Sequence, residues 1–415
     1  MKKIITQLQQ VKNVSYKLAR LSAQEKTQIL LSLAVCLQKH KGEILVANNE
    51  DVRRAKKNGA TAAFLDRLTL SQKTFEGMIT QLKTVAKIAD PVGEILEQLE
   101  LANGINLRKM RFPLGVILMI YESRPNVTID AASLCLRSGN VAVLKGGSEA
   151  YNTNKALVAC IRSVMRQYNV DESAVTFLEK VTHADVEEIL QRNDLIDMVI
   201  PRGSYTLTSA VAEKSRIPIL YHSSGGARMY IDESANLKKA LEICINAKTN
   251  RTGVCNALDM VLIHTNVAKK ILPLLDKALE EKGFQIRADK KAKKYMVHAI
   301  NATNKDFETE FLDSILAVRI VESADEAIAF IKTHTHGHTE VLAAEDKRVV
   351  SRFISEIDAA GLMINCSSRL HDGGEFGLGA EMGIATGKFH ARGPVGAREL
   401  TTYKWIAYGN GQIKH

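Results

Sequence analysis

Apolar residues recur at helical spacing through the first ninety or so positions of the chain. Ser22 and Glu25 form a capping box, in which each side chain satisfies an orphan amide of the first helical turn. The apolar residues that follow on one helix face are Ile29, Leu30, Leu33 and Leu37. Residues 45–57 and 71–89 continue in the same style until Pro91 ends the run. We therefore predict a helical N-terminal region.

After this region, short apolar runs alternate with helical stretches. The candidate strands are Val116–Tyr121, Val141–Leu144, Met198–Ile200, Ile217–Leu220, Met229–Ile231, Met260–His264, Val318–Val321 and Leu362–Asn365. Apolar strands that alternate with helices indicate parallel sheets covered on both faces. We place a first domain at residues 1–240, a second at 241–365, and a return to the first at 366–415.

Composition argues against membrane and nucleic-acid partners. No apolar run approaches the ~18 residues of a membrane span, and the basic N-terminus lacks the apolar region of a secretory signal. The net charge is +10, but its densest cluster, Lys290–Lys294, lacks interleaved aromatics and is more typical of a solvated helix face. An anionic substrate and a phosphorylated cofactor would explain the basic bias equally well. The cysteines are scattered singly, which favours free thiols in a reducing cytoplasm.

One of these cysteines, Cys255, is a candidate nucleophile. It lies in a polar, loop-like stretch, residues 250–257, between a helical stretch and the strand-like run at 260–264. Thr252 and Gly253 provide a small, flexible approach for a substrate carbonyl. A single cysteine is more commonly a small buried apolar residue. The polar neighbours favour the nucleophile here.

Two predicted strand ends carry residues suited to a dinucleotide. Lys145 follows a buried strand, at the edge where open α/β sheets bind ligands, and suits ribose hydroxyls or a 2′-phosphate. Ser148 is expected to cap the next helix. Gly203 and Ser204 would open a helix whose free amides can hold a pyrophosphate. The alternative for Lys145 is a lysine in solvent, and the GxGxxG fingerprint of common NAD-binding domains is absent.

Two further polar residues are candidates for contacts with a substrate. Asn126 follows a strand and a rigid proline, where its amide can donate to an oxyanion or cap the following helix. Glycines are dense from residue 372 to 379, which indicates tight backbone contacts around a pocket. Beyond them, Arg392 can clamp a carboxylate or phosphate, or form a structural ion pair.

Together these segments resemble the gamma-glutamyl phosphate reductases (glutamate-5-semialdehyde dehydrogenases) of the aldehyde dehydrogenase superfamily. The resemblance spans about residues 111–405. Its most specific stretches are Tyr121–Thr128, Leu144–Glu149, Thr309–Ala317, His390–Pro394 and Leu400–Trp405. It implies an α/β fold of the aldehyde dehydrogenase type, with two parallel-sheet domains and an oligomerisation hairpin. The hairpin strand near residues 99–112 and the C-terminal residues 401–413 would join subunits, so a homodimer or homotetramer is expected.

The resemblance also implies a reaction. In this family a thiolate attacks L-glutamyl 5-phosphate and expels phosphate, and NADPH reduces the thioester to L-glutamate 5-semialdehyde, the second step of proline biosynthesis from glutamate. By position, Cys255 corresponds to the nucleophile and Asn126 to the oxyanion donor. The implied cofactor contacts are Lys145, Ser148, Gly203, Ser204 and Glu310, and the implied substrate contacts are Arg124, His390 and Arg392. Glutamate 5-kinase, which makes the labile substrate, is a possible partner.

One difference from the hydrolytic aldehyde dehydrogenases is consistent with this reaction. Those enzymes carry a water-activating glutamate before a Gly-Gly pair, whereas this chain has His222, Ser223 and Ser224 before Gly225 and Gly226. A thioester that must be reduced should not meet an activated water. A CoA-acylating or hydrolytic aldehyde dehydrogenase remains the alternative enzyme, and a basic nucleic-acid-binding module the alternative of another class.

The chain departs from the family pattern in several places. Arg251-Thr252-Gly253 differs from the usual residues before the cysteine, and Asp259 stands where a glutamate is usual. Residues 227–229, which include Arg228, replace a Cys-His pair. The family's His-Thr-Glu sequence is kept at residues 338–340, but the residues upstream differ. A metal site is a hypothesis for three histidines at alternate positions, His334, His336 and His338. Because no carboxylate side chains support this spacing, a structural loop is favoured and no metal is expected.

Overall fold

The computed structural model describes residues 2–221 and 224–414 and divides into two compact units. The first unit runs to Tyr221 and takes back residues 377–383 and everything from Val395. The second unit contains the rest, up to Phe376 and again from Ile384 to Pro394. The domain boundary predicted at residue 240 therefore moves to residue 221, and the one predicted at 365 moves to 376. The reason for the first change is that strand β7 (Ala227–Ile231) pairs with strands of the second unit.

The N-terminal region is helical, as predicted. Its helices are α1 (Lys2–Leu18), α2 (Ala23–Lys39), α3 (Lys41–Lys57), α4 (Ala62–Leu68) and α5 (Gln72–Lys87). The capping box is present at the start of α2: the Ser22 hydroxyl accepts from the Glu25 amide at 3.2 Å, and the Glu25 carboxylate accepts from the Ser22 amide at 2.7 Å. This start signal is local, so it could be recognised without tertiary information.

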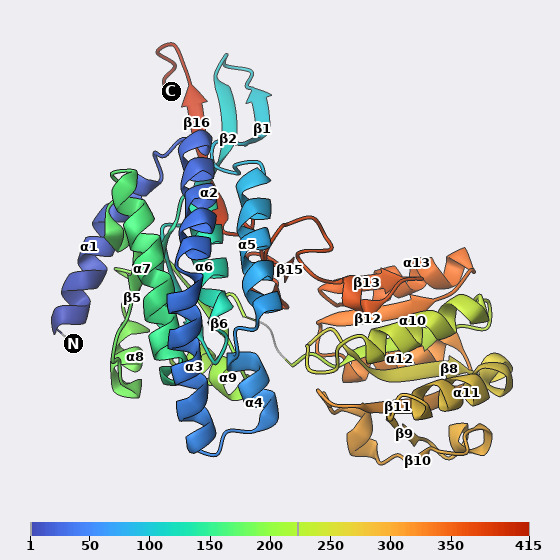
Figure 1. The fold of residues 1–415 in the computed structure, drawn as a ribbon. Coiled ribbons are helices and arrows are strands. Elements are labelled where there is room, and N and C mark those ends of the chain that lie inside the picture. The colour runs from blue at the N-terminus through green and yellow to red at the C-terminus, as the bar shows by residue number, and fades with distance from the viewer. Residues whose placement is uncertain (1, 222–223, 415) are drawn as a thin grey trace. The chain divides into compact units, whose positions relative to one another are not determined.

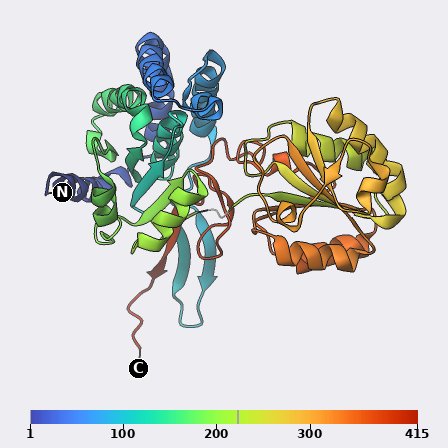
Figure 2. The same cartoon turned by 90° about the horizontal axis from the view of Figure 1, so that it is seen from below.

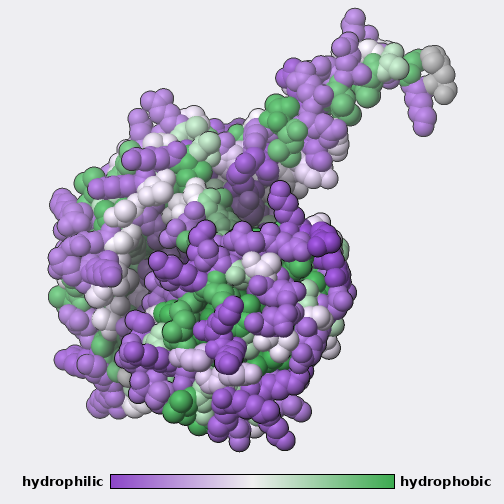
Figure 3. All heavy atoms as spheres, turned by 90° about the vertical axis from the view of Figure 1, so that its right-hand side faces the viewer, coloured by the Kyte–Doolittle hydropathy of each residue, from purple (hydrophilic) through white to green (hydrophobic). Residues whose placement is uncertain are grey.

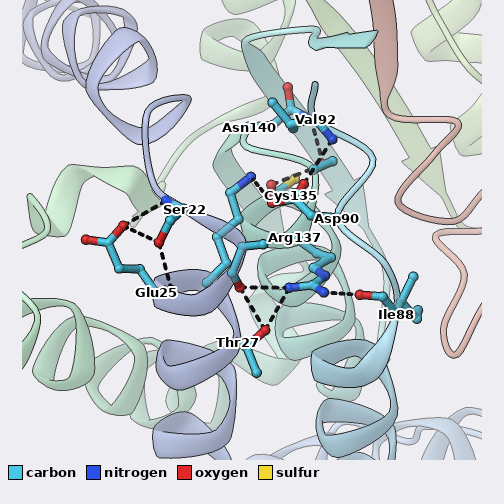
Figure 4. A network of polar contacts seen from close by, with 12 residues as sticks. Ser22, Glu25, Thr27, Ile88, Asp90, Val92, Cys135, Arg137 and Asn140 are labelled. Carbon is cyan, nitrogen blue, oxygen red and sulfur yellow. Dashed lines mark hydrogen bonds and ion pairs between the residues drawn. The ribbon is translucent and has the colours of Figure 1, made fainter. Parts of the chain in front are cut away.

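A buried polar network joins these helices to α6 (Asn126–Arg137), as Figure 4 shows. The Lys26 ammonium has no exposed surface and lies 2.8 Å from the Asp90 carboxylate. Arg137 donates to the Thr27 hydroxyl at 3.0 Å and to the Ile88 carbonyl. Burial lowers the pKa of Lys26, and the bond to Asp90 opposes that shift. The pair thus compensates a buried charge.

Replacing Asp90 with asparagine should lower the free energy of unfolding by about 3 kcal/mol, because it leaves Lys26 buried and charged without its counter-ion. Chemical denaturation measures this change. The double variant Lys26→Met/Asp90→Asn removes the orphaned charge and should recover most of the loss. Equal loss in both variants would show that the effect comes from packing around Asp90 instead.

The first unit is built on a four-stranded parallel sheet in the order β5-β4-β3-β6. Its strands are β3 (Val116–Tyr121), β4 (Val141–Gly146), β5 (Val175–Phe177) and β6 (Met198–Arg202). The helices that follow them are α6, α7 (Tyr151–Gln167), α8 (His183–Ile189) and α9 (Tyr205–Lys214). The strand predicted at 217–220 is wrong: only Ile219 forms an isolated bridge, to Val199, and the adjacent Pro218 has no amide hydrogen to extend a ladder.

A separate antiparallel sheet belongs to the first unit and projects from its helices (Figure 1). Here β2 (Asn106–Pro113) pairs with β1 (Ile95–Glu100) on one side and with β16 (Thr401–Tyr408) on the other. The single hairpin strand predicted near residues 99–112 is thus two strands, and the second of them pairs with the C-terminal strand of the same chain. All residues of β1 are exposed. Figure 3 shows apolar side chains among polar ones on the projecting arm that this three-stranded sheet forms.

The second unit holds a seven-stranded parallel sheet in the order β10-β9-β11-β8-β7-β12-β13. Besides β7, its strands are β8 (Leu258–His264), β9 (Gln285–Ala288), β10 (Ile300–Asn301), β11 (Ile315–Val321), β12 (Thr339–Ala343) and β13 (Gly361–Ile364). One core packs against α10 (Leu237–Thr249) and α11 (Thr265–Glu280). The other packs against α12 (Ala324–His334) and α13 (Lys347–Glu356). Figure 2 shows these helix pairs on opposite faces of the sheet, so the prediction of covered parallel sheets is confirmed.

Short elements complete the described chain: η1 (Ser148–Ala150), η2 (Glu172–Ala174), η3 (Ala292–Tyr295), η4 (Asn304–Phe307), η5 (Ser368–Leu370), β14 (Ile384–Ala385) and β15 (Gly393–Pro394). The basic cluster that the sequence places on a helix face runs into η3, a single 3₁₀ turn. Among the described residues, no helix is both long and apolar enough to cross a membrane.

Candidate active site

Cys255 lies in the loop between α10 and β8 and is partly buried. The next residue anchors this loop: the Asn256 amide donates to the His371 carbonyl at 3.0 Å, and the Ser368 hydroxyl donates to the Asn256 carbonyl at 2.6 Å. Both partners come from the segment around η5, more than 110 positions away. The loop that carries the thiol is thus fixed to this segment of the same unit by two hydrogen bonds.

A buried ion pair joins the two ends of the cysteine loop. Lys248, in the last turn of α10, lies 3.0 Å from Asp259, the second residue of β8, and both side chains are almost fully buried. Burial raises the pKa of Asp259 to about 6, while Lys248 acts in the opposite direction. Asp259 also accepts from the backbone of Phe311, next to Glu310. The pair ties the ends of the loop to the segment that carries Glu310.

Gly225 packs directly against Cys255, the candidate nucleophile. A Cβ atom on this residue would overlap the Cys255 carbonyl oxygen and lie 2.7 Å from the Cys255 Cα and 2.5 Å from Glu310 Oε1. The neighbouring Ser224 hydroxyl donates to Glu310 Oε2 at 2.6 Å. The second unit therefore brings together two predicted site residues, Cys255 and Glu310, around a turn that tolerates only glycine.

Arg369 is a residue of this site that sequence reasoning missed. It donates to the Asn250 side chain at 3.2 Å and to the Asn256 side chain, so it spans the cysteine loop. Burial lowers its pKa, and so does Arg251, whereas the charges of Asp372 and Cys255 act in the opposite direction. The charge interaction with Cys255 places the Arg369 guanidinium in the surroundings of the thiol. No motif around Arg369 signals this, because the contact arises from folding η5 onto the loop.

Asn126 begins α6 in the first unit, but it does not cap that helix. Its amide donates to Asp130 Oδ2 at 2.9 Å, one turn further along. Asp130 is buried, which raises its pKa to about 7, against the opposing effects of Asn126 and Arg202. The capping alternative is therefore wrong. The bond to Asp130 fixes which way the Asn126 amide points.

Lys145, the next-to-last residue of β4, lines a cavity of about 230 Å³. The cavity is lined by further cations, Arg54 and Lys180, and by the rings of Tyr151 and Phe177. Ser148 also lines it, but its side chain caps no helix; η1 begins there after Gly147, and no side-chain cap is formed. Cations beside aromatic rings suit a phosphorylated nucleoside. Neither Arg54 nor Lys180 was apparent from the sequence.

Gly203 and Ser204 lie where predicted, at the start of α9, and Ser204 is the N-cap. The Glu122 carboxylate occupies this helix end, accepting from the Ser204 amide at 2.9 Å and from its hydroxyl at 3.0 Å. A carboxylate here shows that the helix end attracts an anion. A pyrophosphate bound at the same amides would have to displace Glu122.

The three predicted substrate contacts lie on two segments. Arg124 is partly exposed in the turn between β3 and α6, and His390 is exposed in the second unit. Arg392 donates to Asp358 at 2.6 Å, so the structural ion pair that the sequence left open is present. Lys388 also contacts Asp358, and these two cations lower the pKa of that carboxylate.

The three alternating histidines are directed to different partners. His334 stacks on Phe330, His336 bonds the Gly225 carbonyl, and His338 bonds the Thr339 hydroxyl. Within residues 2–221 and 224–414, no group of three or more His, Cys, Asp or Glu side chains is placed to hold a metal ion.

Comparison with known proteins decides the family. A model of the aldehyde dehydrogenase family matches residues 2–294. The gamma-glutamyl phosphate reductase of Carboxydothermus hydrogenoformans is 43% identical over 414 residues, which cover 100% of both chains.

The chain belongs to the aldehyde dehydrogenase family.

Solved structures of this family agree with the fold. The gamma-glutamyl phosphate reductase of Thermotoga maritima is 40% identical, covers 99% of each chain and superimposes with a TM-score of 0.96. An acetylating aldehyde dehydrogenase of Geobacillus thermoglucosidasius covers 100% of this chain and 98% of its own, with a TM-score of 0.73 at 16% identity, and shares the fold. The predictions of an aldehyde dehydrogenase-type α/β fold and of an oxidoreductase are confirmed at the level of the family.

One segment of this chain, residues 222–226, includes Gly225, which contacts Cys255. Ser224 precedes Gly225 and Gly226, and its hydroxyl is bound to Glu310. His222 and Ser223, which belong to the same segment, lie outside the described residues. None of these five residues is a carboxylic acid.

Proposed function

We propose that this chain reduces L-glutamyl 5-phosphate to L-glutamate 5-semialdehyde and phosphate, with NADPH as the reductant, in the second step of proline biosynthesis. The observation that carries the proposal is the full-length similarity, above 40%, to relatives named for this reaction. The site supports it, because Cys255 lies in an anchored loop that Arg369 spans. In addition, residues 222–226, where a hydrolytic enzyme would carry its water-activating glutamate, include no carboxylic acid.

In the proposed mechanism, the Cys255 thiolate attacks the acyl carbon of the substrate. The Asn126 amide, oriented by Asp130, donates to the oxygen that becomes negative. The C–O bond to phosphate then breaks, phosphate leaves with the electron pair, and a thioester remains on Cys255. Phosphate is a good leaving group and needs little acid assistance. Arg124, His390 and Arg392 are proposed to bind the substrate's carboxylate and phosphate groups.

Most of the proposed cofactor contacts are in the first unit. The chain's own cations fit a phosphorylated nucleotide: Lys145, Arg54 and Lys180 line one cavity with two aromatic rings. When bound, NADPH supplies the hydride that reduces the thioester. Ser148, Gly203 and Ser204 are proposed to contact the cofactor's phosphates and ribose, and Glu310 its nicotinamide ribose.

Lys180→Ala should raise the KM for NADPH about tenfold while changing the KM for NADH little, because the lost cation would pair with the 2′-phosphate that only NADPH carries. Steady-state kinetics with both cofactors measure the difference. Lys87→Ala, an exposed lysine at the end of α5, is the matched control. An equal rise for both cofactors would place Lys180 on another part of the nucleotide.

The reaction run backward tests the proposed function, because the forward substrate decomposes in water. Purified protein is mixed with glutamate 5-semialdehyde, NADP and phosphate, and NADPH absorbance is followed with and without phosphate. NADPH formation that requires phosphate supports the proposal. Formation without phosphate would show a hydrolytic aldehyde dehydrogenase, and a requirement for CoA would show a CoA-acylating one.

A homo-oligomer, a dimer or tetramer, is proposed from the antiparallel sheet of the first unit. The exposed strand β1 carries Leu96 and Leu99, and β16 carries Tyr403 and Trp405, each exposed by 39–49%. Unpaired strand edges and exposed apolar side chains are normally covered by a partner. We further propose a cytoplasmic enzyme, supported by its free cysteines, that receives its labile substrate from glutamate 5-kinase.

Replacing Leu99 and Trp405 together with glutamate should shift the protein to monomers, because charges on this sheet oppose its burial against a second copy. Light scattering at micromolar concentration measures the molar mass. Glutamate at Tyr16 and Val46, exposed apolar residues on helices of the same unit, is the control and should leave the mass unchanged. A monomeric wild-type protein would contradict the assignment.

A further inference from the structure

The Gly225–Gly226 turn is in direct contact with the proposed nucleophile, Cys255. Gly225 leaves no room for even a methyl group between itself, the Cys255 backbone and Glu310. Any rotation of this turn must therefore move one of those two residues. Whatever holds the turn also holds the proposed nucleophile.

Two side chains hold the two carbonyl groups of this turn. His336 Nδ1 lies 2.7 Å from the Gly225 oxygen, and Arg228 Nη1 donates to the Gly226 oxygen at 2.8 Å. A carbonyl only accepts, so the hydrogen of the first bond is on His336 Nδ1. Burial lowers the pKa of His336, as do the charges of Arg228 and His338, and this favours the neutral ring.

The two donors are connected through a second chain of contacts. Glu340, buried like Arg228, lies 3.6 Å from the Arg228 guanidinium. It accepts from the Thr335 hydroxyl at 2.6 Å, and that hydroxyl accepts from the Gly337 amide at 2.9 Å. Thr335 and Gly337 flank His336. We name these four side chains, Arg228, His336, Glu340 and Thr335, the turn clamp.

Arg228 and His336 come from different elements of the second unit, β7 and the segment after α12. They meet at one turn, because they bind its two consecutive carbonyls. They are therefore parts of one arrangement.

We propose that the turn clamp is a positioning device for catalysis, in which the Nδ1–H of His336 and the guanidinium of Arg228 hold the Gly225 and Gly226 carbonyls so that Cys255 and Glu310 keep their reactive placement. His336 is thus a positioning residue, which acts through the bond from its Nδ1 to the Gly225 carbonyl. The inference rests on the proposed function in taking Cys255 as the nucleophile.

The decisive comparison is His336→Asn against His336→Leu. The asparagine Nδ2 takes the place of histidine Nδ1 and still donates to Gly225, whereas leucine cannot. We expect His336→Leu to lower kcat about tenfold or more with little change in KM, and His336→Asn to stay within about threefold of the wild type. The rate of alkylation of Cys255 by iodoacetamide, followed by mass spectrometry, should change in the same order.

His334→Leu is the matched control, because His334 also bonds a backbone carbonyl, that of Phe330, but within its own helix. It should leave kcat and alkylation unchanged. If His336→Leu does not fold, Thr335→Val opens the clamp without touching the turn, and it should lower kcat with KM preserved.

Equal impairment of the asparagine and leucine variants would overturn the proposal, since it would mean that the second ring nitrogen or the ring itself matters. Wild-type kinetics in both would overturn it too. The alkylation assay needs neither substrate nor cofactor. A wild-type protein inactive toward glutamate semialdehyde would thus reject the proposed function, while the alkylation order would still decide the clamp.

Discussion

Replacing Cys255 with alanine is expected to abolish phosphate-dependent formation of NADPH from glutamate semialdehyde. The thiol is the only group of the anchored 250–257 loop able to form a thioester, and covalent attachment is what the proposed reduction requires. Cys255→Ser should be inactive as well, because a hydroxyl ionises far less readily than a thiol and is a weaker nucleophile. Absorbance at the NADPH band measures both.

Cys366→Ala is the control for this prediction, since Cys366 is a free, partly buried cysteine of the same unit. Burial raises the pKa of its thiol, which makes it a poor nucleophile. It should retain wild-type activity. Substantial turnover by Cys255→Ala would assign the chemistry to a different residue.

Replacing Gly225 with alanine is expected to lower kcat by about 100-fold or more. The new methyl group would collide with the Cys255 backbone and with Glu310, so both would shift by a fraction of an ångström to an ångström. The free energy of unfolding should fall by about 1–3 kcal/mol, the usual range for overpacking. Kinetics and chemical denaturation together separate the two effects.

Gly253→Ala serves as the matched control, because Gly253 lies in the cysteine loop itself and a Cβ there would meet nothing within 4 Å. Its kinetics should be close to those of the wild type. If both variants lost activity equally, loop flexibility would explain the result better than contact with Gly225. If neither variant lost activity, the turn would accommodate a methyl group at Gly225 without displacing Cys255 or Glu310.

Some features of this protein follow from the sequence because their causes are local or periodic. The capping box of α2 needs only residues three apart. The strands β3, β4 and β8 contain the apolar runs 116–121, 141–144 and 260–263, which are typical of strands buried inside a sheet. Cys255 could be singled out as a nucleophile from the polar loop around it. Its family could be inferred from short motifs.

Other features depended on contacts between distant segments. The boundary between the units lies at residue 221, not 240, because β7 pairs with β8 and β12 of the second unit. The sequence of a strand does not reveal which sheet the strand will join. Ser148 was expected to cap a helix, but the chain first makes a 3₁₀ turn that begins after Gly147. The Asn126 side chain donates to Asp130 and does not cap α6, although the backbone amides of the first helical turn are nearer to it in sequence.

The candidate active site shows most clearly which features follow from the sequence and which depend on the tertiary structure. The residue types proposed to carry the chemistry, the thiol of Cys255 and the amide of Asn126, could be selected from the sequence alone. Arg369, Lys180 and the turn clamp were decided only by the tertiary structure, since each acts on a group that folding brings near it from another element. The physical reason is that a reactive group is recognisable by what it is, whereas a group that orients it is recognisable only by where it lies.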